Sequence, residues 1–269
     1  MTDLRADGRR PSGGPRFTPG QFTPRPQPAP VLQMLMAQSR MELRLLLRNG
    51  EQLLLTLFIP VTMLIGLCLL PIATHGESRA DRFVPAIMTV AVMSTAFTGQ
   101  AIAVGFDRRY GALKRLGATP LPRWGVIAGK SIAVAIVVVL QAVVLGAIGV
   151  AFGWDVGPGG LLVGAVAIAI GTLTFSALGL LLGGTLRAEI VLALANIAWF
   201  VFIGIGSLVV AGSSVPEAVR WVARCSPSGA LAEALHQATR LSVDWVGFGV
   251  LIAWGVVAAA AAVRCFRFT

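Results

Sequence analysis

The sequence predicts an all-α, polytopic membrane protein with six transmembrane helices, an N-terminal interfacial helix and both termini in the cytoplasm. Composition is the first indication: of 269 residues, 56% are hydrophobic and 13% are charged, whereas soluble domains carry about 25% charged residues. This balance also excludes a disordered chain, and three cysteines are too few for a disulfide scaffold. The other indications are six long apolar segments and a net charge of +10 that is concentrated in a few loops.

Residues 1–30 differ in composition from the rest of the chain. Seven of the fifteen prolines lie between Pro11 and Pro30, and no apolar run accompanies them. A segment that buries so little apolar surface cannot offset its ordering entropy, so we predict a disordered cytoplasmic tail. The pair Arg9-Arg10 is typical of twin-arginine export signals, but prolines and glycines follow it where such a signal needs a hydrophobic core.

Residues 31–51 have the pattern of an amphipathic helix, with apolar side chains on one face and a stripe of arginines on another. The apolar face holds Leu32, Leu35, Met36, Leu43, Leu46 and Leu47, and the stripe holds Arg40, Arg44 and Arg48. The segment is too charged to span a bilayer and too apolar to leave it. We therefore predict a helix that lies in the inner interface against anionic lipid headgroups. The alternative is that these residues are the first turns of the next helix.

Residues 52–269 are predicted to form the transmembrane domain. A bilayer core of roughly 30 Å needs about 20 helical residues. Six apolar segments reach that length, near 52–72, 84–105, 128–152, 160–184, 189–211 and 244–263. Glycines four residues apart let helices approach closely, and the pairs here are Gly149 with Gly153, Gly160 with Gly164, and Gly179 with Gly183.

The basic residues predict the orientation. With a cytoplasmic N-terminus, the inner segments hold eight arginines before the first span, six Lys or Arg from Arg108 to Lys130, then Arg187, Arg264 and Arg267. The outer loops hold five arginines, and the acidic residues divide equally between the two sides. Positive residues concentrate on the cytoplasmic side of membrane proteins. The chain is therefore expected in the cytoplasmic (inner) cell membrane with both termini inside.

The loop at residues 106–127, which we call the basic loop, joins the second and third spans. We predict a short helix over Asp107–Leu116 and a break over Gly117–Pro122. By composition alone this is equally an ordinary positively charged inner loop. The predicted helix has Asp107 at its N-terminal end, Lys114 and Arg115 at its C-terminal end, and Leu113 with Leu116 as an apolar edge.

The basic loop resembles that of the ABC type-2 exporter permeases, in particular their drug- and antibiotic-resistance branch. In that family the loop has an acidic residue, two basic residues, a glycine, a Leu-Lys-Arg-Leu-like run, Thr-Pro, a basic–aromatic pair and Gly-Lys. The matching residues are Asp107, Arg108, Arg109, Gly111, Leu113, Lys114, Arg115, Leu116, Thr119, Pro120, Arg123, Trp124, Gly129 and Lys130, with Asp107 in place of the usual Glu. The resemblance implies that the first eight couple the chain to a separate ATPase, as a helix docked in that subunit's groove.

The outer loop at residues 213–242 carries a second match. Ser214 and Glu217 have the spacing of a capping box for a short helix, and Ser226 with Pro227 predicts the start of another. The family has Pro-Glu-x-x-x-Trp and then Asn-Pro here, in a re-entrant hairpin on the outer side. The matching residues are Pro216, Glu217, Trp221 and Pro227, whereas Ser226 replaces the usual Asn. The resemblance covers roughly residues 31–265.

The interiors of the six spans lack Asp, Glu, Lys, Arg and His, which argues against an ion-driven carrier or proton pump. Neutral polar residues remain, and five are candidates for a substrate path between protomers. The alternative is that each bonds to its own helix or to a neighbouring one. The candidates are Thr95, Thr98, Gln141, Asn196 and Ser207. Glu189, at the inner end of the fifth span, is expected to pair with Arg187 or to face water.

Several patterns resemble functional motifs without meeting their requirements. Gly125 to Ser131 resembles a phosphate-binding loop, but only three residues separate its glycines and no strand precedes it. His75 and His236 have no neighbour at metal-ligand spacing, so no metal site is predicted. The three cysteines lie at different depths and predict no internal disulfide. Cys265 has a possible role in acylation, with an inert thiol as the favoured alternative.

The resemblance implies a transmembrane permease subunit of an ABC exporter for a hydrophobic or amphipathic substrate, such as a drug, an antibiotic or a lipid. A separate ATPase would hold ATP and Mg²⁺, so no cofactor and no enzymatic activity are expected in this chain. The expected partners are that ATPase, a second permease protomer (a copy or a paralogue) and membrane lipids, but no nucleic acid. The alternatives are a non-transporting membrane scaffold or sensor and, with less support, a membrane-embedded enzyme, which would need a base or acid beside the span hydroxyls.

Overall fold

The structure is a computed structural model that describes residues 29–71, 78–211 and 215–265. Nearly all of the predicted tail, and the histidine at position 75, lie outside these ranges. Every regular element within them is helical, so the all-α fold class is confirmed. The elements are α1 (Val31–Arg48), α2 (Gly50–Leu69), α3 (Arg79–Val92), η1 (Met93–Gly99), α4 (Gln100–Arg109), α5 (Ala112–Gly117), α6 (Arg123–Ala151), α7 (Pro158–Thr185), α8 (Ala188–Val210), α9 (Glu217–Arg224), α10 (Pro227–Thr239) and α11 (Trp245–Cys265).

Five continuous helices are long and apolar enough to cross a membrane. They are Arg79–Arg109, Trp124–Ala151, Pro158–Thr185, Ala188–Val210 and Trp245–Cys265. The first predicted span corresponds to α2, whose described part Leu54–Leu69 is apolar but shorter than these five. The length and composition of these helices make the chain a multi-pass membrane protein.

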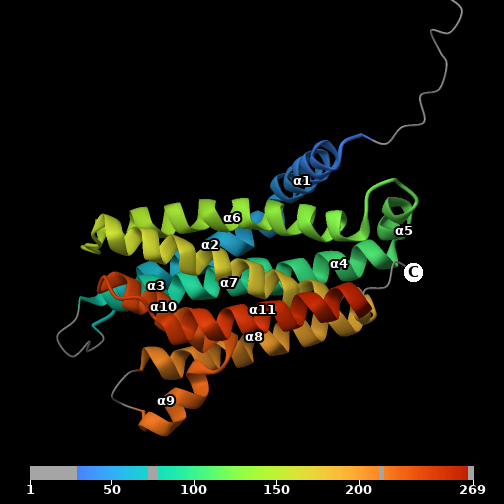
Figure 1. The fold of residues 1–269 in the computed structure, drawn as a ribbon. Coiled ribbons are helices and arrows are strands. Elements are labelled where there is room, and N and C mark those ends of the chain that lie inside the picture. Colours follow the sequence, from blue (N-terminus) through green and yellow to red (C-terminus); the bar gives the residue numbers. More distant parts are fainter. Residues whose placement is uncertain (1–28, 72–77, 212–214, 266–269) are drawn as a thin grey trace, which may run out of the picture.

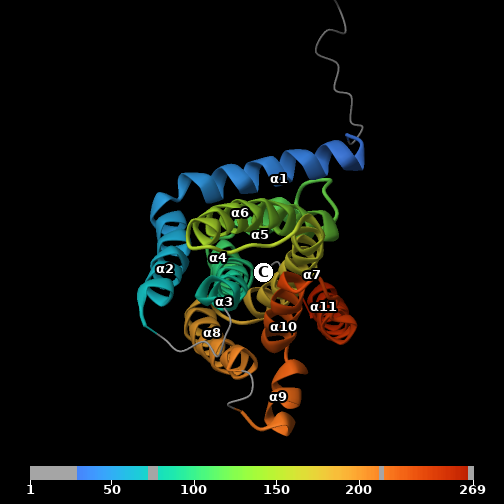
Figure 2. The same cartoon turned by 90° about the vertical axis from the view of Figure 1, so that its left-hand side faces the viewer.

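The long helices run side by side, with α5 at one end of the bundle and the α9–α10 pair at the other (Figure 1). A view along the bundle shows α1 lying crosswise over α6, with α2 descending beside them (Figure 2). Helix α1 ends at Arg48 with Asn49 as its cap, and α2 begins at Gly50. Residues 31–48 are therefore a separate helix, whereas the last two residues of the predicted segment 31–51 belong to α2. The position of α1 in the membrane interface stays a prediction.

Helix α1 turns three polar residues toward the bundle, whereas the predicted stripe of Arg40, Arg44 and Arg48 is exposed. Gln38, Ser39 and Glu42 are buried, whereas the apolar side chains of Leu32 and Met36 are exposed. An amphipathic helix on a soluble protein would bury the opposite face. The exposed surface of α1 thus carries both apolar side chains and arginines, the mixture that the predicted interfacial helix requires.

The second predicted span, 84–105, is part of the most enclosed helix of the bundle. It runs from Arg79 to Arg109, with 72% of its most apolar stretch buried, against 17% for α8. A π-helical segment, η1, lies in its middle. No sequence pattern predicted this segment. Such segments are frequent at functional sites.

Two glycines of α7 allow this central helix to come close. A Cβ atom at Gly179 would lie 2.7 Å from the carbonyl oxygen of Phe97, and one at Gly183 would clash with the carbonyl oxygen of Ala101. The predicted role of this glycine pair in close packing is therefore confirmed. The same expectation is wrong for Gly153, which follows the end of α6 and has open space around it.

Candidate functional site

The basic loop does not form the single helix that the sequence predicted over Asp107–Leu116. Helix α4 continues to Arg109, the chain reverses at Gly111, and α5 begins at Ala112. Gly111 has a φ of 71°, a left-handed conformation that costs other residues roughly 1–2 kcal/mol. Asp107 therefore lies in the last turn of α4, not at the N-terminal end of the short helix.

The short helix α5 is anchored to the bundle by one leucine. Leu113 is fully buried against Val104, Val126 and Leu180. Leu116 packs against the same cluster while remaining partly exposed. The predicted apolar edge of the helix therefore faces the bundle, which turns the basic residues of α5 outward.

The exposed face of the basic loop, which points away from the bundle, combines positive charge with aromatic surface. Lys114 and Arg115 of α5 are exposed, and Tyr110 and Trp124 expose 69% and 51% of their surface. Aromatic residues and arginine are enriched in protein interfaces. This exposed face therefore has the charge and the aromatic groups that complement a surface with acidic and apolar residues. The opposite face of the loop packs on the bundle.

Lys130 connects three helices through a buried ion pair and a partly buried one. Its Nζ atom in α6 lies 2.9 Å from Oε2 of Glu42 in α1 and 2.7 Å from Oδ2 of Asp107 in α4. Only 7% of the Lys130 side chain is exposed. Gln38 donates a further bond of 2.7 Å to Oε1 of Glu42. We call Glu42, Asp107 and Lys130 the ionic triad; it holds α1 against the start of the basic loop.

The two arginines after Asp107 bind the turn between α7 and α8. Arg108 donates to the carbonyl oxygens of Gly184 and Leu186 at 2.7 and 2.8 Å. These carbonyls lie at the C-terminal end of α7, where such groups lack partners within the helix. Arg109 forms an exposed ion pair with Glu189 at the start of α8. The expected partner of Glu189, Arg187, is replaced by Arg109.

The predicted coupling residues thus lie in one region of the structure, but some contact the bundle and others are exposed. Asp107, Arg108 and Leu113 bond or pack inward, whereas Lys114 and Arg115 face outward. Sequence reasoning missed Glu42. A signal was available, because Glu42 is the only acidic residue of α1 and stands one turn after Gln38.

The outer hairpin lies at the opposite end of the bundle. Its second helix starts as predicted: the Ser226 hydroxyl accepts a bond of 3.1 Å from the Gly229 N–H, with Pro227 in the first turn. The first helix, α9, begins at Glu217 after Pro216 without a side-chain cap; the predicted cap, the serine at position 214, lies outside the described residues.

Polar contacts hold this hairpin against α11. Arg224 forms an ion pair of 2.7 Å with Asp244, which is 4% exposed. The Trp254 indole donates to the carbonyl oxygen of Cys225 at 3.0 Å. Trp221 lies under the Arg224 guanidinium, 4.8 Å from ring centroid to Cζ, and remains 45% exposed.

His236 of α10 is the histidine of the outer hairpin. Burial lowers the pKa of its imidazole below the usual value. The carboxylate of Glu233 opposes this shift, and the guanidinium of Arg82 adds to it. The side chain is therefore held in its neutral form at neutral pH.

The five candidate path residues differ in what they contact. Thr95 donates to Gln141 at 3.0 Å, and Gln141 donates to the Thr56 carbonyl oxygen, so both side chains are buried in bonds between helices. Asn196 and Ser207 are exposed on α8 and bond back to carbonyls of their own helix. The Thr98 hydroxyl is buried without a hydrogen-bond partner in the described structure.

Comparison with known proteins identifies a family. The sequence profile of a family described as ABC-2 type transporter matches residues 33–239. The match includes most of α1, all of the basic loop and the outer hairpin through the end of α10. No curated protein matches the chain.

Proposed function

Because the chain belongs to the ABC-2 type transporter family, it is a transmembrane subunit of an ABC transporter, and we propose that its basic loop receives the motion of a separate ATPase subunit. Membership of this family makes the chain a transport component that is not itself catalytic. ATP and Mg²⁺ would be bound by the partner.

The observation that carries the proposal is the two-sided construction of the basic loop. On its inner side, Asp107, Arg108 and Leu113 are bonded or packed to α1, α6 and the α7–α8 turn. On the face that points away from the bundle, Lys114 and Arg115 are exposed. A force applied to the exposed side would therefore be carried into several helices at once, because packed elements move as units.

The exposed face of α8 supports a second permease protomer. Ile190, Ile197 and Phe200 are 46%, 59% and 66% exposed. Asn196 and Ser207 lie exposed on the same helix, whereas Thr95 and Gln141 are buried within one protomer. If the substrate passes between two protomers, Asn196 and Ser207 are the better candidates for lining its path.

The proposed transport reaction is export of a hydrophobic or amphipathic substrate, such as a drug, an antibiotic or a lipid, across the cytoplasmic membrane. Closure of the ATPases would push on α5 and reopen the bundle toward the α9–α10 end. This assignment places both chain termini in the cytoplasm, in agreement with the concentration of basic residues on that side.

The experiment combines copurification with ATPase measurements. The candidate ATPase is tested against wild type, the double variant Lys114→Glu with Arg115→Glu, and Gly111→Pro, which cannot adopt the observed φ. The matched control is Arg220→Glu, in the hairpin at the other end. We expect roughly tenfold or greater loss of association or of stimulated hydrolysis in both loop variants, and wild-type behaviour of the control. Unchanged association and stimulation in both loop variants would exclude the coupling role.

A further inference from the structure

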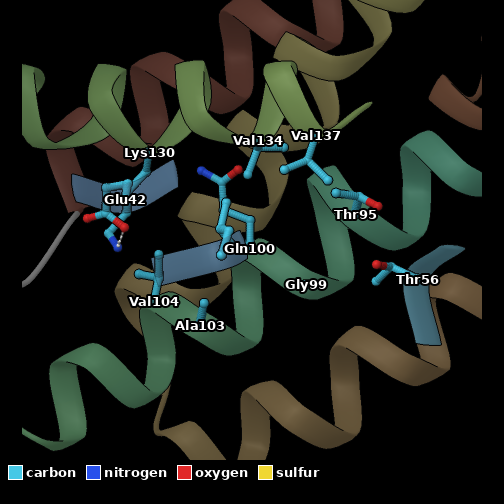
Figure 3. A pocket seen from close by; sticks show the side chains of 11 residues that line it. Glu42, Thr56, Thr95, Gly99, Gln100, Ala103, Val104, Lys130, Val134 and Val137 are labelled. Atoms are coloured by element: carbon cyan, nitrogen blue, oxygen red, sulfur yellow. Dashed lines mark hydrogen bonds and ion pairs between the residues drawn. The ribbon is translucent and has the colours of Figure 1, made fainter. Parts of the chain in front are cut away.

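A small cavity lies beside the ionic triad, between α1, α4 and α6. Its volume is about 40 Å³, and its polar lining includes Glu42, Lys130, Gln100 and Thr95. Figure 3 shows Glu42 and Lys130 on one side of this space and Thr95 and Thr56 on the other, with the Gln100 side chain between them. The cavity thus joins the charged end of the bundle to the neutral polar residues around η1.

The cavity is bordered by hydrogen-bond donors that the protein does not satisfy. Gln100 is 4% exposed, and its Oε1 accepts a bond of 2.9 Å from Ser176, but its Nε2 has no partner in the described structure. In Figure 3 this nitrogen is on the side of the Glu42–Lys130 pair. Lys130 has three N–H donors, and Glu42 and Asp107 accept from two of them. A buried amide without an acceptor is costly, so an occupant that accepts hydrogen bonds is expected here.

We propose that this cavity is a buried hydration site, occupied by ordered water that accepts hydrogen bonds from Gln100 Nε2 and Lys130 Nζ. Buried waters typically make about three hydrogen bonds. The Glu42 carboxylate supplies the acceptor for the water's own hydrogens. A water needs roughly 10–15 Å³ of such space, so about 40 Å³ holds about three or four at most.

The charges and donors around the cavity favour water over an ion. The ionic triad has two carboxylates and one ammonium group, a net charge of −1, which repels an anion. A cation needs several oxygen ligands, but the two Glu42 oxygens already accept bonds from Gln38 and Lys130. Gln100 Nε2 and the third N–H of Lys130 are donors and would repel a cation. A neutral molecule that both accepts and donates fits both conditions, and at this volume that molecule is water.

The hydration site lowers the cost of separating the ion pairs that hold α1 and the basic loop together. When Lys130 and Asp107 separate, water beside them can replace the lost partner, which lowers the cost of exposing a buried charge. Gln100 is then a positioning residue: it holds the water that solvates Lys130, and through Ser176 it also contacts α7. This inference concerns the folded chain alone and does not depend on the ATPase partner.

The first test uses the sign of a stability change. In a Ser176→Ala background, which removes the other partner of Gln100, we compare Gln100 with Gln100→Met by thermal unfolding of the full chain in lipid nanodiscs. If water is bound, Met removes one of its partners, and the unfolding temperature falls by about 2–4 °C. If the cavity is dry, Met removes an unsatisfied amide, and an equal or higher unfolding temperature would overturn the proposal.

Thr98→Val is the matched control, because the Thr98 hydroxyl is also buried without a partner but does not line this cavity. We expect its unfolding temperature to stay the same or rise. A fall equal to that of Gln100→Met would show that loss of any polar group here destabilises the fold, and would remove the support for water.

Two further measurements do not depend on how the variants fold. High-resolution density of the wild-type chain in nanodiscs should show a peak within hydrogen-bond distance of Gln100 Nε2 and Lys130 Nζ; an empty cavity at that resolution contradicts the proposal. Replacing NaCl by KCl or choline chloride at constant ionic strength should leave the wild-type unfolding temperature unchanged. Stabilisation by Na⁺ or K⁺ that is lost in Gln100→Met would instead identify a cation site.

Discussion

Both ends of the bundle contain ion pairs with buried members, but the pairs at the two ends connect different helices. At the α5 end, Lys130 reaches residues 88 and 23 positions away and ties α1 and α4 to α6. At the α9–α10 end, Arg224 and Asp244 are 20 residues apart and close the local hairpin onto the start of α11. Loss of the first pair should therefore loosen the arrangement of whole helices, whereas loss of the second should act locally.

The ends also differ in what surrounds the charges. Glu42 and Lys130 of the ionic triad border a small cavity, and the basic loop that begins beside Asp107 carries an exposed basic surface. In the hairpin, by contrast, the second helix α10 is buried along most of its length. This difference supports the proposal that a partner acts on the α5 end, whereas α10 at the hairpin end is packed within the described chain.

The largest effect is expected from Lys130→Met. The substitution leaves two carboxylates close together without their counter-charge, and removal of one member of a buried pair typically costs about 3–5 kcal/mol. Thermal unfolding of the purified chain measures this loss. The variant that also carries Glu42→Gln and Asp107→Asn should recover most of it; failure to recover would show that packing of the lysine stem, rather than charge, sets the cost.

A smaller and local effect is expected from Asp244→Asn at the other end. The neutral amide can still accept a hydrogen bond from Arg224, so a loss of about 1–3 kcal/mol is expected. Limited proteolysis should show faster cleavage within residues 215–242 and unchanged cleavage of the basic loop. Equal acceleration at both ends would contradict the distinction between a long-range and a local pair.

The smallest effect is expected from Arg109→Ala, because its pair with Glu189 is exposed, with 50% and 64% of the side chains accessible. Exposed pairs contribute about 0–1 kcal/mol and are screened by salt. The unfolding temperatures of wild type and variant should converge as the NaCl concentration rises to about 0.5 M. A loss comparable with that of Lys130→Met would mean that this surface pair also holds the bundle together.

The parts of the fold that the sequence predicted are those controlled by local pattern. The long apolar helices follow from runs of apolar residues that a bilayer requires, and the start of α10 follows from Ser226 and Pro227, whose capping role is set within one turn. Close packing at Gly179 and Gly183 was predictable for the same reason, since their spacing places them on one helix face.

The errors of prediction arise where a distant contact overrides local preference. Asp107 was expected to favour the start of a short helix, but it lies in the last turn of α4, where it pairs with Lys130 of α6. Arg187 was the nearest partner of Glu189 in sequence, yet Arg109 is the one that the fold brings to it. The sequence shows a glycine at position 111, but it does not show that the chain reverses there after the end of α4.

The sequence by itself therefore determined the membrane class, the helical segments, the basic loop and the family resemblance, because composition, periodicity and motif spacing are properties of neighbouring residues. Only the tertiary structure decided which charges pair, which side of the basic loop is exposed, and that Gln100 and Lys130 border one cavity. These features depend on contacts between residues far apart in the chain. Burial then makes them consequential, since an unpaired polar group costs far more inside the bundle than at its surface.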